Sequence, residues 1–163
     1  MKLIAHYIFS LGVLALMGQG ALGLLLALWL SFSVNRLIDL GHTRRGNYIS
    51  RSWVTHDLYT APFWGAGVGL LTYFALLYAR VVAPVAVAMG VVSALSHLLL
   101  DAVTESGIFV AKKRKAIAHF SYSDPRLNAL AILGGMLMFL FAVLHFAFGQ
   151  LALAPQGALF ALA

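Results

Sequence analysis

Long apolar stretches, separated by turns and by two polar segments, make up most of the chain. The first stretch, residues 3–34, contains no Lys, Arg, Asp or Glu. As one helix it would be about 48 Å long, whereas the hydrocarbon core of a bilayer is about 30 Å thick. The chain must therefore turn back, and the Gly-Gln-Gly sequence at 18–20 is the predicted turn. We expect helices over 3–17 and 21–39, the first short enough to be tilted or to form one arm of a re-entrant hairpin.

Three further apolar stretches predict three further spans, at 59–78, 82–103 and 127–148. The polar segments 40–55 and 104–126 separate them from one another and from the first helices, and we expect both to be loops. The predicted fold is therefore an all-α integral membrane bundle of about five transmembrane helices.

The last span begins with a capping signal. Asp124 is expected at the N-cap and Pro125 at the first helical position. The predicted organisation is a single helical membrane domain, residues 1–148, followed by a short apolar tail, residues 149–163, that lies in the membrane interface.

Composition supports a membrane location. Hydrophobic residues make up 62% of the 163 residues and charged residues only 10%, whereas soluble domains are about half apolar and about a quarter charged. The apolar run at the N-terminus is too long for a signal peptide, so we expect no cleavage. Cysteine is absent, which excludes disulfides and thiolate metal sites.

The basic residues fall on one side of the predicted bundle. Of the 11 Lys and Arg residues, only Arg80 lies in a turn on the other side. The positive-inside rule then places the N-terminus and both polar loops in the cytoplasm, in a multi-pass protein of the cell membrane. The net charge of +6 is explained by this orientation, so we expect membrane lipid and not nucleic acid as a partner.

Polar residues from distant parts of the chain are predicted to meet at the cytoplasmic end, because successive helices of a bundle alternate in direction. These residues are His6, Asp39, His42, His56, Asp57, His97, Asp101 and Asn128. His97 and Asp101 are four residues apart and share a helix face. By contrast, His145 stands alone at the opposite end, and His119 in the basic loop is expected on the surface.

Ionisable groups at membrane depth are costly and mark candidate functional sites. Imidazole and carboxylate donors without thiolate suit a divalent metal, zinc first and manganese or iron as alternatives. A purely structural polar network is the other interpretation of the same residues.

Four segments carry a resemblance to a known family: Ala5–Ser10, Asp39–His42, Thr55–His56 and Ser96–Thr104. In this order they resemble the membrane-bound metal-dependent hydrolases, which include the LexA-regulated inner-membrane hydrolase family and archaeal relatives of unknown function. The resemblance implies a metal-ligand set of His6, Asp39, His42, His56, His97 and Asp101.

The chain also departs from that family's pattern at three positions. Gly41 replaces an acid, Arg51 occupies a histidine position, and Asp57 replaces a usual serine. These departures speak against a two-metal centre and leave one metal, or an inactive descendant, as the expectation.

The leading hypothesis is a metal-dependent hydrolase at the cytoplasmic face, in which the metal activates a water and Asp101 or Asp39 is ligand or base. Arg51 and Arg44 could hold a phosphate, and the depth of the site suggests a lipid-linked phosphoester as substrate. The catalytic candidates are therefore Asp101 and Arg51.

The alternative is a non-enzymatic membrane subunit whose His/Asp cluster is structural or docks a partner. A transporter is disfavoured, because no span has ionisable residues at its middle.

Overall fold

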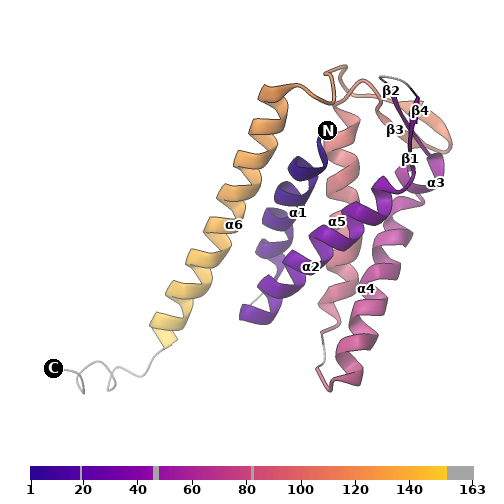
Figure 1. Cartoon of the computed structure of the whole chain (residues 1–163). Helices are drawn as coiled ribbons and strands as arrows, with labels where there is room; N and C mark the ends of the chain where they lie inside the picture. The colour runs from indigo at the N-terminus through magenta and orange to yellow at the C-terminus, as the bar shows by residue number, and fades with distance from the viewer. Residues whose placement is uncertain (19, 46–47, 82, 154–163) are drawn as a thin grey trace.

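The computed structural model describes residues 1–18, 20–45, 48–81 and 83–153 and is mostly helical. Its elements, in chain order, are α1 (Leu3–Met17), α2 (Gly20–Asp39), β1 (His42–Arg45), β2 (Tyr48–Arg51), α3 (Trp53–His56), α4 (Ala61–Tyr78), α5 (Val85–Ala102), β3 (Ile108–Val110), β4 (Lys113–Lys115) and α6 (Pro125–Leu153). In Figure 1, α1, α4, α5 and α6 run roughly along one direction, and α2 is inclined to them.

Helix α5 lies at the centre of the bundle and contacts α1, α2 and α4, while α6 packs on α1 (Figure 1). Glycines allow the closest of these contacts. A Cβ atom on Gly135 of α6 would clash with the carbonyl of Ile8 in α1, and one on Gly65 of α4 would clash with the carbonyl of Gly90 in α5. Small residues at helix interfaces are typical of membrane bundles, where close backbone approach provides the packing.

Four helices are long and apolar enough to cross a membrane: Gly20–Asp39, Ala61–Tyr78, Val85–Ala102 and Pro125–Gly149. Their outward faces carry exposed large apolar side chains, including those of Trp29, Phe63, Leu71 and Leu137. Helix α1 has 15 residues and is therefore only about 22 Å long. It is shorter than a full span, as its sequence indicates, and the number of membrane crossings stays a prediction.

The two ends of the bundle differ in character. The N-terminus, α3 and both β-hairpins lie at one end, whereas the α4–α5 connection and the last turns of α6 lie at the other (Figure 1). The helices thus alternate in direction as the sequence predicts, and this alternation brings His6, Asp39 and Asp101 to the same end.

The two polar segments are more structured than the loops expected from the sequence. Strands β1 and β2 form one antiparallel hairpin and β3 and β4 another, and α3 follows the first. The second hairpin turns at Ala111 and Lys112, which both have positive φ (50° and 64°). This geometry favours Asn and Gly, so two residues without that preference gave no turn signal in the sequence.

Helix α6 begins as expected and ends later than expected. Asp124 Oδ1 accepts hydrogen bonds from the backbone N–H groups of Arg126 and Leu127, both at 2.9 Å, and Pro125 is the first helical residue. The N-cap prediction is confirmed. The helix continues past Phe148 to Leu153, because no helix-breaking residue precedes Pro155. The rest of the predicted tail, 154–163, lies outside the described residues.

Candidate metal centre

The six residues expected as metal ligands come from five elements and meet beneath the hairpins. His6 is on α1, Asp39 at the end of α2 and His42 at the start of β1. His56 is the last residue of α3, and one turn of α5 separates His97 from Asp101. Helices α1, α2 and α5 thus form the base of the site. The segment from β1 to α3, here called the covering segment, contributes His42 and His56.

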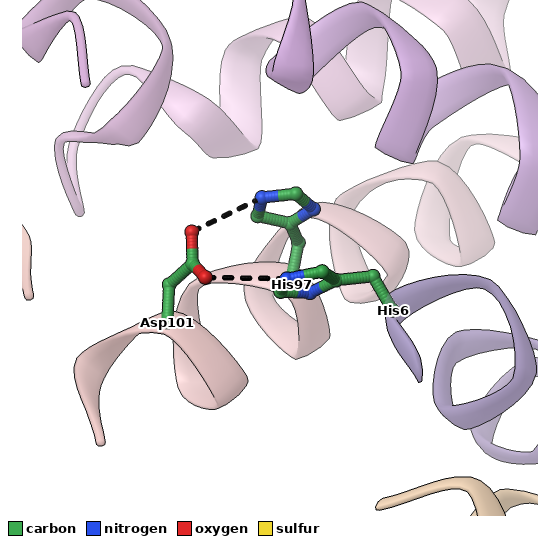
Figure 2. A group of neighbouring side chains, drawn as sticks. All are labelled: His6, His97 and Asp101. Carbon is green, nitrogen blue, oxygen red and sulfur yellow. Dashed lines mark ion pairs between the residues drawn. The ribbon is translucent and has the colours of Figure 1, made fainter. Parts of the chain in front are cut away.

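One group of donors consists of His6, His97 and Asp101, all fully buried (Figure 2). Each imidazole faces a different oxygen of the carboxylate. His6 Nε2 lies 3.2 Å from Asp101 Oδ1, and His97 Nε2 lies 3.3 Å from Asp101 Oδ2. The two imidazole rings stack with their centroids 4.0 Å apart.

A second group consists of Asp39, His42 and His56. His42 Nδ1 lies 3.3 Å from Asp39 Oδ1, and His42 Nε2 lies 2.9 Å from His56 Nε2. His56 is fully buried, whereas the side chains of His42 and Asp39 are 22% and 11% exposed. The open edge of the cluster is therefore formed by Asp39 and His42.

The two groups form one continuous cluster. His97 Nε2 lies 3.5 Å from Asp39 Oδ1, and His56 Nε2 lies 3.6 Å from Asp101 Oδ2. Donor atoms held about 2.0–2.1 Å from one tetrahedral cation are about 3.3–3.4 Å from each other. The imidazole–carboxylate distances in the cluster, 3.2 to 3.6 Å, are close to this value.

Several donor atoms at the centre of the cluster make no hydrogen bond although they are buried. They are Asp39 Oδ1, Asp101 Oδ2, His6 Nε2 and His97 Nε2. A buried polar atom without a hydrogen bond is unfavourable by about 1–3 kcal/mol. Among these four atoms, His97 Nε2 lies next to both Asp101 Oδ2 and Asp39 Oδ1, and a cation fits between these three atoms.

Neighbouring side chains orient the rings of His97 and His56, and for His97 they also determine which nitrogen can bind a metal ion. His97 Nδ1 lies 2.8 Å from Asn35 Oδ1, an atom that can only accept, so the ring proton is on Nδ1 and the lone pair on Nε2. His56 Nδ1 lies 2.8 Å from Thr55 Oγ1, a hydroxyl that can donate or accept, so this contact orients the ring without fixing its tautomer. Neither Asn35 nor Thr55 was predicted from the sequence as a residue of the site. The spacing of Asn35 and Asp39, one helical turn apart, was the available signal for the first.

The two imidazoles of the covering segment are held in the form that binds metals. Burial lowers the pKa of His42 from 6.5 to about 4. Burial, aided by the neighbouring His97, lowers the pKa of His56 from 6.5 to about 2. Both rings are therefore neutral at pH 7, and protons do not compete with a cation for their nitrogens.

Arg51 lies within the cluster rather than at its rim. Its Nη2 donates to Asp101 Oδ1 at 2.7 Å, and its Nη1 donates to Thr104 Oγ1 at 3.1 Å and to the Gly107 carbonyl at 2.6 Å. The amino group of Met1 also donates to Asp101 Oδ1, at 2.8 Å. The side chain expected to hold a phosphate is thus used here to bind Asp101, and only its Nε makes no hydrogen bond.

The other expected polar residues have different positions. Asp57 ties the segment after α3 to the second hairpin, since its carboxylate accepts from the backbone N–H groups of Tyr59 (2.9 Å) and Lys112 (2.7 Å). Asn128 accepts from the Lys2 backbone N–H at 2.9 Å and thereby ties α6 to the start of the chain. His145 stacks on Phe141 near the opposite end of α6. The side chain of Arg44 lies outside the described part of the structure.

Fold and site together define a mostly helical protein with membrane-length helices and a buried His/Asp cluster that could hold a metal ion. Residues 1–100 match the model of the DUF1286 family, described as proteins of unknown function, and the chain belongs to this family. The matched region contains every candidate ligand except Asp101, which follows it directly. No curated protein and no solved structure matches the chain.

Proposed function

We propose that this protein is a metal-dependent hydrolase embedded in the cell membrane, with its site at the cytoplasmic face and a lipid-linked phosphoester as substrate. The observation that carries the proposal is the set of buried His and Asp donor atoms that face one another without hydrogen bonds. The resemblance of the ordered His and Asp motifs to membrane-bound metal-dependent hydrolases points in the same direction.

The candidate ligands, from which the ligands of the cation would be drawn, are His6, Asp39, His42, His56, His97 and Asp101. Zinc suits this imidazole and carboxylate set, and manganese or iron are the alternatives. A divalent cation supplies Lewis acidity, which polarises a phosphoryl oxygen and makes a bound water more acidic.

The two carboxylates have different surroundings and so suit different roles. Asp101 is fully buried and fixed by Arg51, which suits a ligand that does not move. Asp39 lies at the open edge beside His42, which suits a ligand on the side from which water and substrate can approach. The Arg51 Nε–H makes no hydrogen bond but is buried, so Arg51 would act on the reaction through its contact with Asp101.

The position of the site explains why a lipid-linked substrate is proposed. The cluster lies at one end of helices whose outer faces are apolar, including the exposed Leu28 and Phe32 on α2, below Asp39. A phosphate at headgroup level could then reach the open edge while its apolar chain stays in the bilayer.

The experiment is an assay of phosphate release by protein purified in detergent, stripped with chelator and reloaded with Zn²⁺ or Mn²⁺. A long-chain lipid phosphate in mixed micelles is compared with a water-soluble phosphoester. We expect metal-dependent release that favours the lipid, is abolished in Asp101→Asn and is preserved in His145→Ala. Release that continues with chelator present, or equally in Asp101→Asn, would contradict the proposal.

A second candidate is a non-enzymatic membrane subunit, and a specific network favours it. Asn35 Nδ2 donates to Ser10 Oγ at 3.1 Å, Ser10 Oγ contacts Ser96 Oγ at 2.6 Å, and Asn35 also contacts His97. These hydrogen bonds tie α1, α2 and α5 together without a metal. If the cluster is only structural, purified protein carries no metal and chelator leaves its thermal unfolding unchanged.

A further inference from the structure

The two oxygens of the Asp101 carboxylate have opposite environments. Oδ1 accepts hydrogen bonds from Arg51 Nη2 at 2.7 Å and from the Met1 amino group at 2.8 Å. Oδ2 makes no hydrogen bond, although it is fully buried. Of the two oxygens, only Oδ2 therefore has lone pairs that no hydrogen-bond donor occupies.

Oδ2 belongs to a ring of four donor atoms. It lies 3.3 Å from His97 Nε2, and His97 Nε2 lies 3.5 Å from Asp39 Oδ1. On its other side Oδ2 lies 3.6 Å from His56 Nε2. The ring closes because a carboxylate oxygen of Asp39 and a ring nitrogen of His56 lie within 4.8 Å of each other. Two nitrogens and two carboxylate oxygens in this arrangement can surround one divalent cation.

The Oδ1 side of the carboxylate is already occupied by two positive charges, the Arg51 guanidinium and the Met1 amino group. Arg51 is held there by three hydrogen bonds, to Asp101, Thr104 and Gly107, and its side chain is 4% exposed. His6 Nε2 also lies on this side, 3.2 Å from Oδ1. A cation shared between His6 and Oδ1 would lie close to the guanidinium in a region of low dielectric, where repulsion between like charges is strong.

We infer that Arg51 takes the place of a second metal ion: the centre holds one divalent cation, on the Oδ2 side of Asp101, with His56, His97, Asp39 and Asp101 as ligands. His6 then belongs to the Arg51 side and is not a ligand in the wild-type protein. Arg51 is a positioning residue, because it binds Oδ1 and thereby directs Oδ2 at the cation. This inference rests on the proposed metal-dependent function and deepens it.

The test measures the number of bound metal ions per chain. Protein in detergent is stripped with chelator and dialysed against Zn²⁺ or Mn²⁺, and bound metal is determined by elemental analysis. We expect one equivalent in the wild type and in Arg51→Lys, which keeps the positive charge. We expect two in Arg51→Gln, where only the Met1 amino group remains on the Oδ1 side and a second cation can bind between His6 and Oδ1. Both variants lose the guanidinium, so they form a matched pair, and thermal unfolding confirms that each is folded.

Two measurements do not depend on the stability of the Arg51 variants. The electron paramagnetic resonance spectrum of Mn²⁺ in the wild type should be that of an isolated ion, without the coupling of a metal pair. His6→Ala should keep its metal affinity within about threefold, whereas His56→Ala should lose about 100-fold or more.

Each outcome decides a separate point. Two equivalents or a coupled spectrum in the wild type would overturn the inference and leave the proposed function intact. A folded Arg51→Gln that binds one equivalent, or a His6→Ala that loses its metal, would also overturn it. A wild type that binds no metal would overturn the proposed function and this inference with it.

Discussion

At the scale of single residues, Asn35 determines which nitrogen of His97 can bind a metal ion. Its amide nitrogen donates to the Ser31 carbonyl at 2.6 Å, which fixes the orientation of the amide and directs Oδ1 at His97 Nδ1. The second nitrogen of a metal-binding histidine is usually held in this way by an oxygen, and the contact sets the tautomer. Asn35 is therefore as much a part of the site as the ligands.

Replacing Asn35 tests this role. Asn35→Leu removes the acceptor while keeping the branched shape of the side chain, and we expect metal affinity to fall about 10- to 100-fold. Asn35→Asp keeps an acceptor oxygen for His97 but loses the donor to Ser31, so its loss of affinity should be smaller than that of Asn35→Leu. Metal titration of the stripped protein measures both. An equal loss of affinity in the two variants would show that Asn35 acts through packing and not through the tautomer of His97.

At the scale of the elements, glycines set how closely α6 approaches α1. A Cβ on Gly135 would clash with the Ile8 carbonyl, whereas a Cβ on Gly134 meets nothing within 4 Å. The side chains of α6 otherwise provide little burial, since most of its large apolar residues are exposed. The contact between α1 and α6 therefore depends on the one face of α6 that carries Gly135.

The neighbouring glycines give a matched pair of variants. Gly135→Leu should destabilise the protein by about 1–3 kcal/mol, because the helices must separate to accommodate the side chain. Gly134→Leu should change stability by no more than about 0.5 kcal/mol. Thermal unfolding in the same detergent measures the difference, and the same midpoint in both variants would refute the close approach of α1 and α6.

The elements also show what the sequence could and could not predict. The apolar runs and their turns predicted the long helices, and the alternation of helix direction predicted that His6, Asp39 and Asp101 share one end. The hairpins were not predicted, because the positive-φ turn at Ala111 and Lys112 lacks Asn and Gly. It is held instead by long-range contacts: the Lys112 backbone N–H donates to Asp57, and the Lys112 amino group lies 4.7 Å from the centre of the Trp53 ring.

The contact between Arg51 and Asp101 could not be predicted from the sequence, for a related reason. The position of Arg51 on Asp101 depends on the first hairpin, in which Arg51 pairs with His42 across the two strands. A residue that only tertiary contacts bring to the site gives no periodic signal along the chain.

At the scale of the whole molecule, the absence of cysteine allows a direct test of orientation. Lys113→Cys places a thiol on β4 at the site end, and Ala79→Cys places one in the turn after α4 at the other end. With the N-terminus in the cytoplasm, a membrane-impermeant maleimide should label Ala79→Cys in intact cells and Lys113→Cys only after permeabilisation. The reverse pattern, or equal labelling in intact cells, would contradict the predicted topology.

The most direct test of the account is the metal content of the purified protein and of two histidine variants. His97 is buried at the centre of the cluster, whereas His145 is exposed at the far end of α6. We expect bound divalent metal in the wild type and in His145→Ala, its loss in His97→Ala, and a lower unfolding temperature on adding chelator to the first two only, because a ligand that binds the folded state stabilises it. The account would be contradicted if the wild type contains no metal, if chelator leaves its unfolding temperature unchanged, and if His97→Ala only lowers its stability. The cluster would then be a structural network.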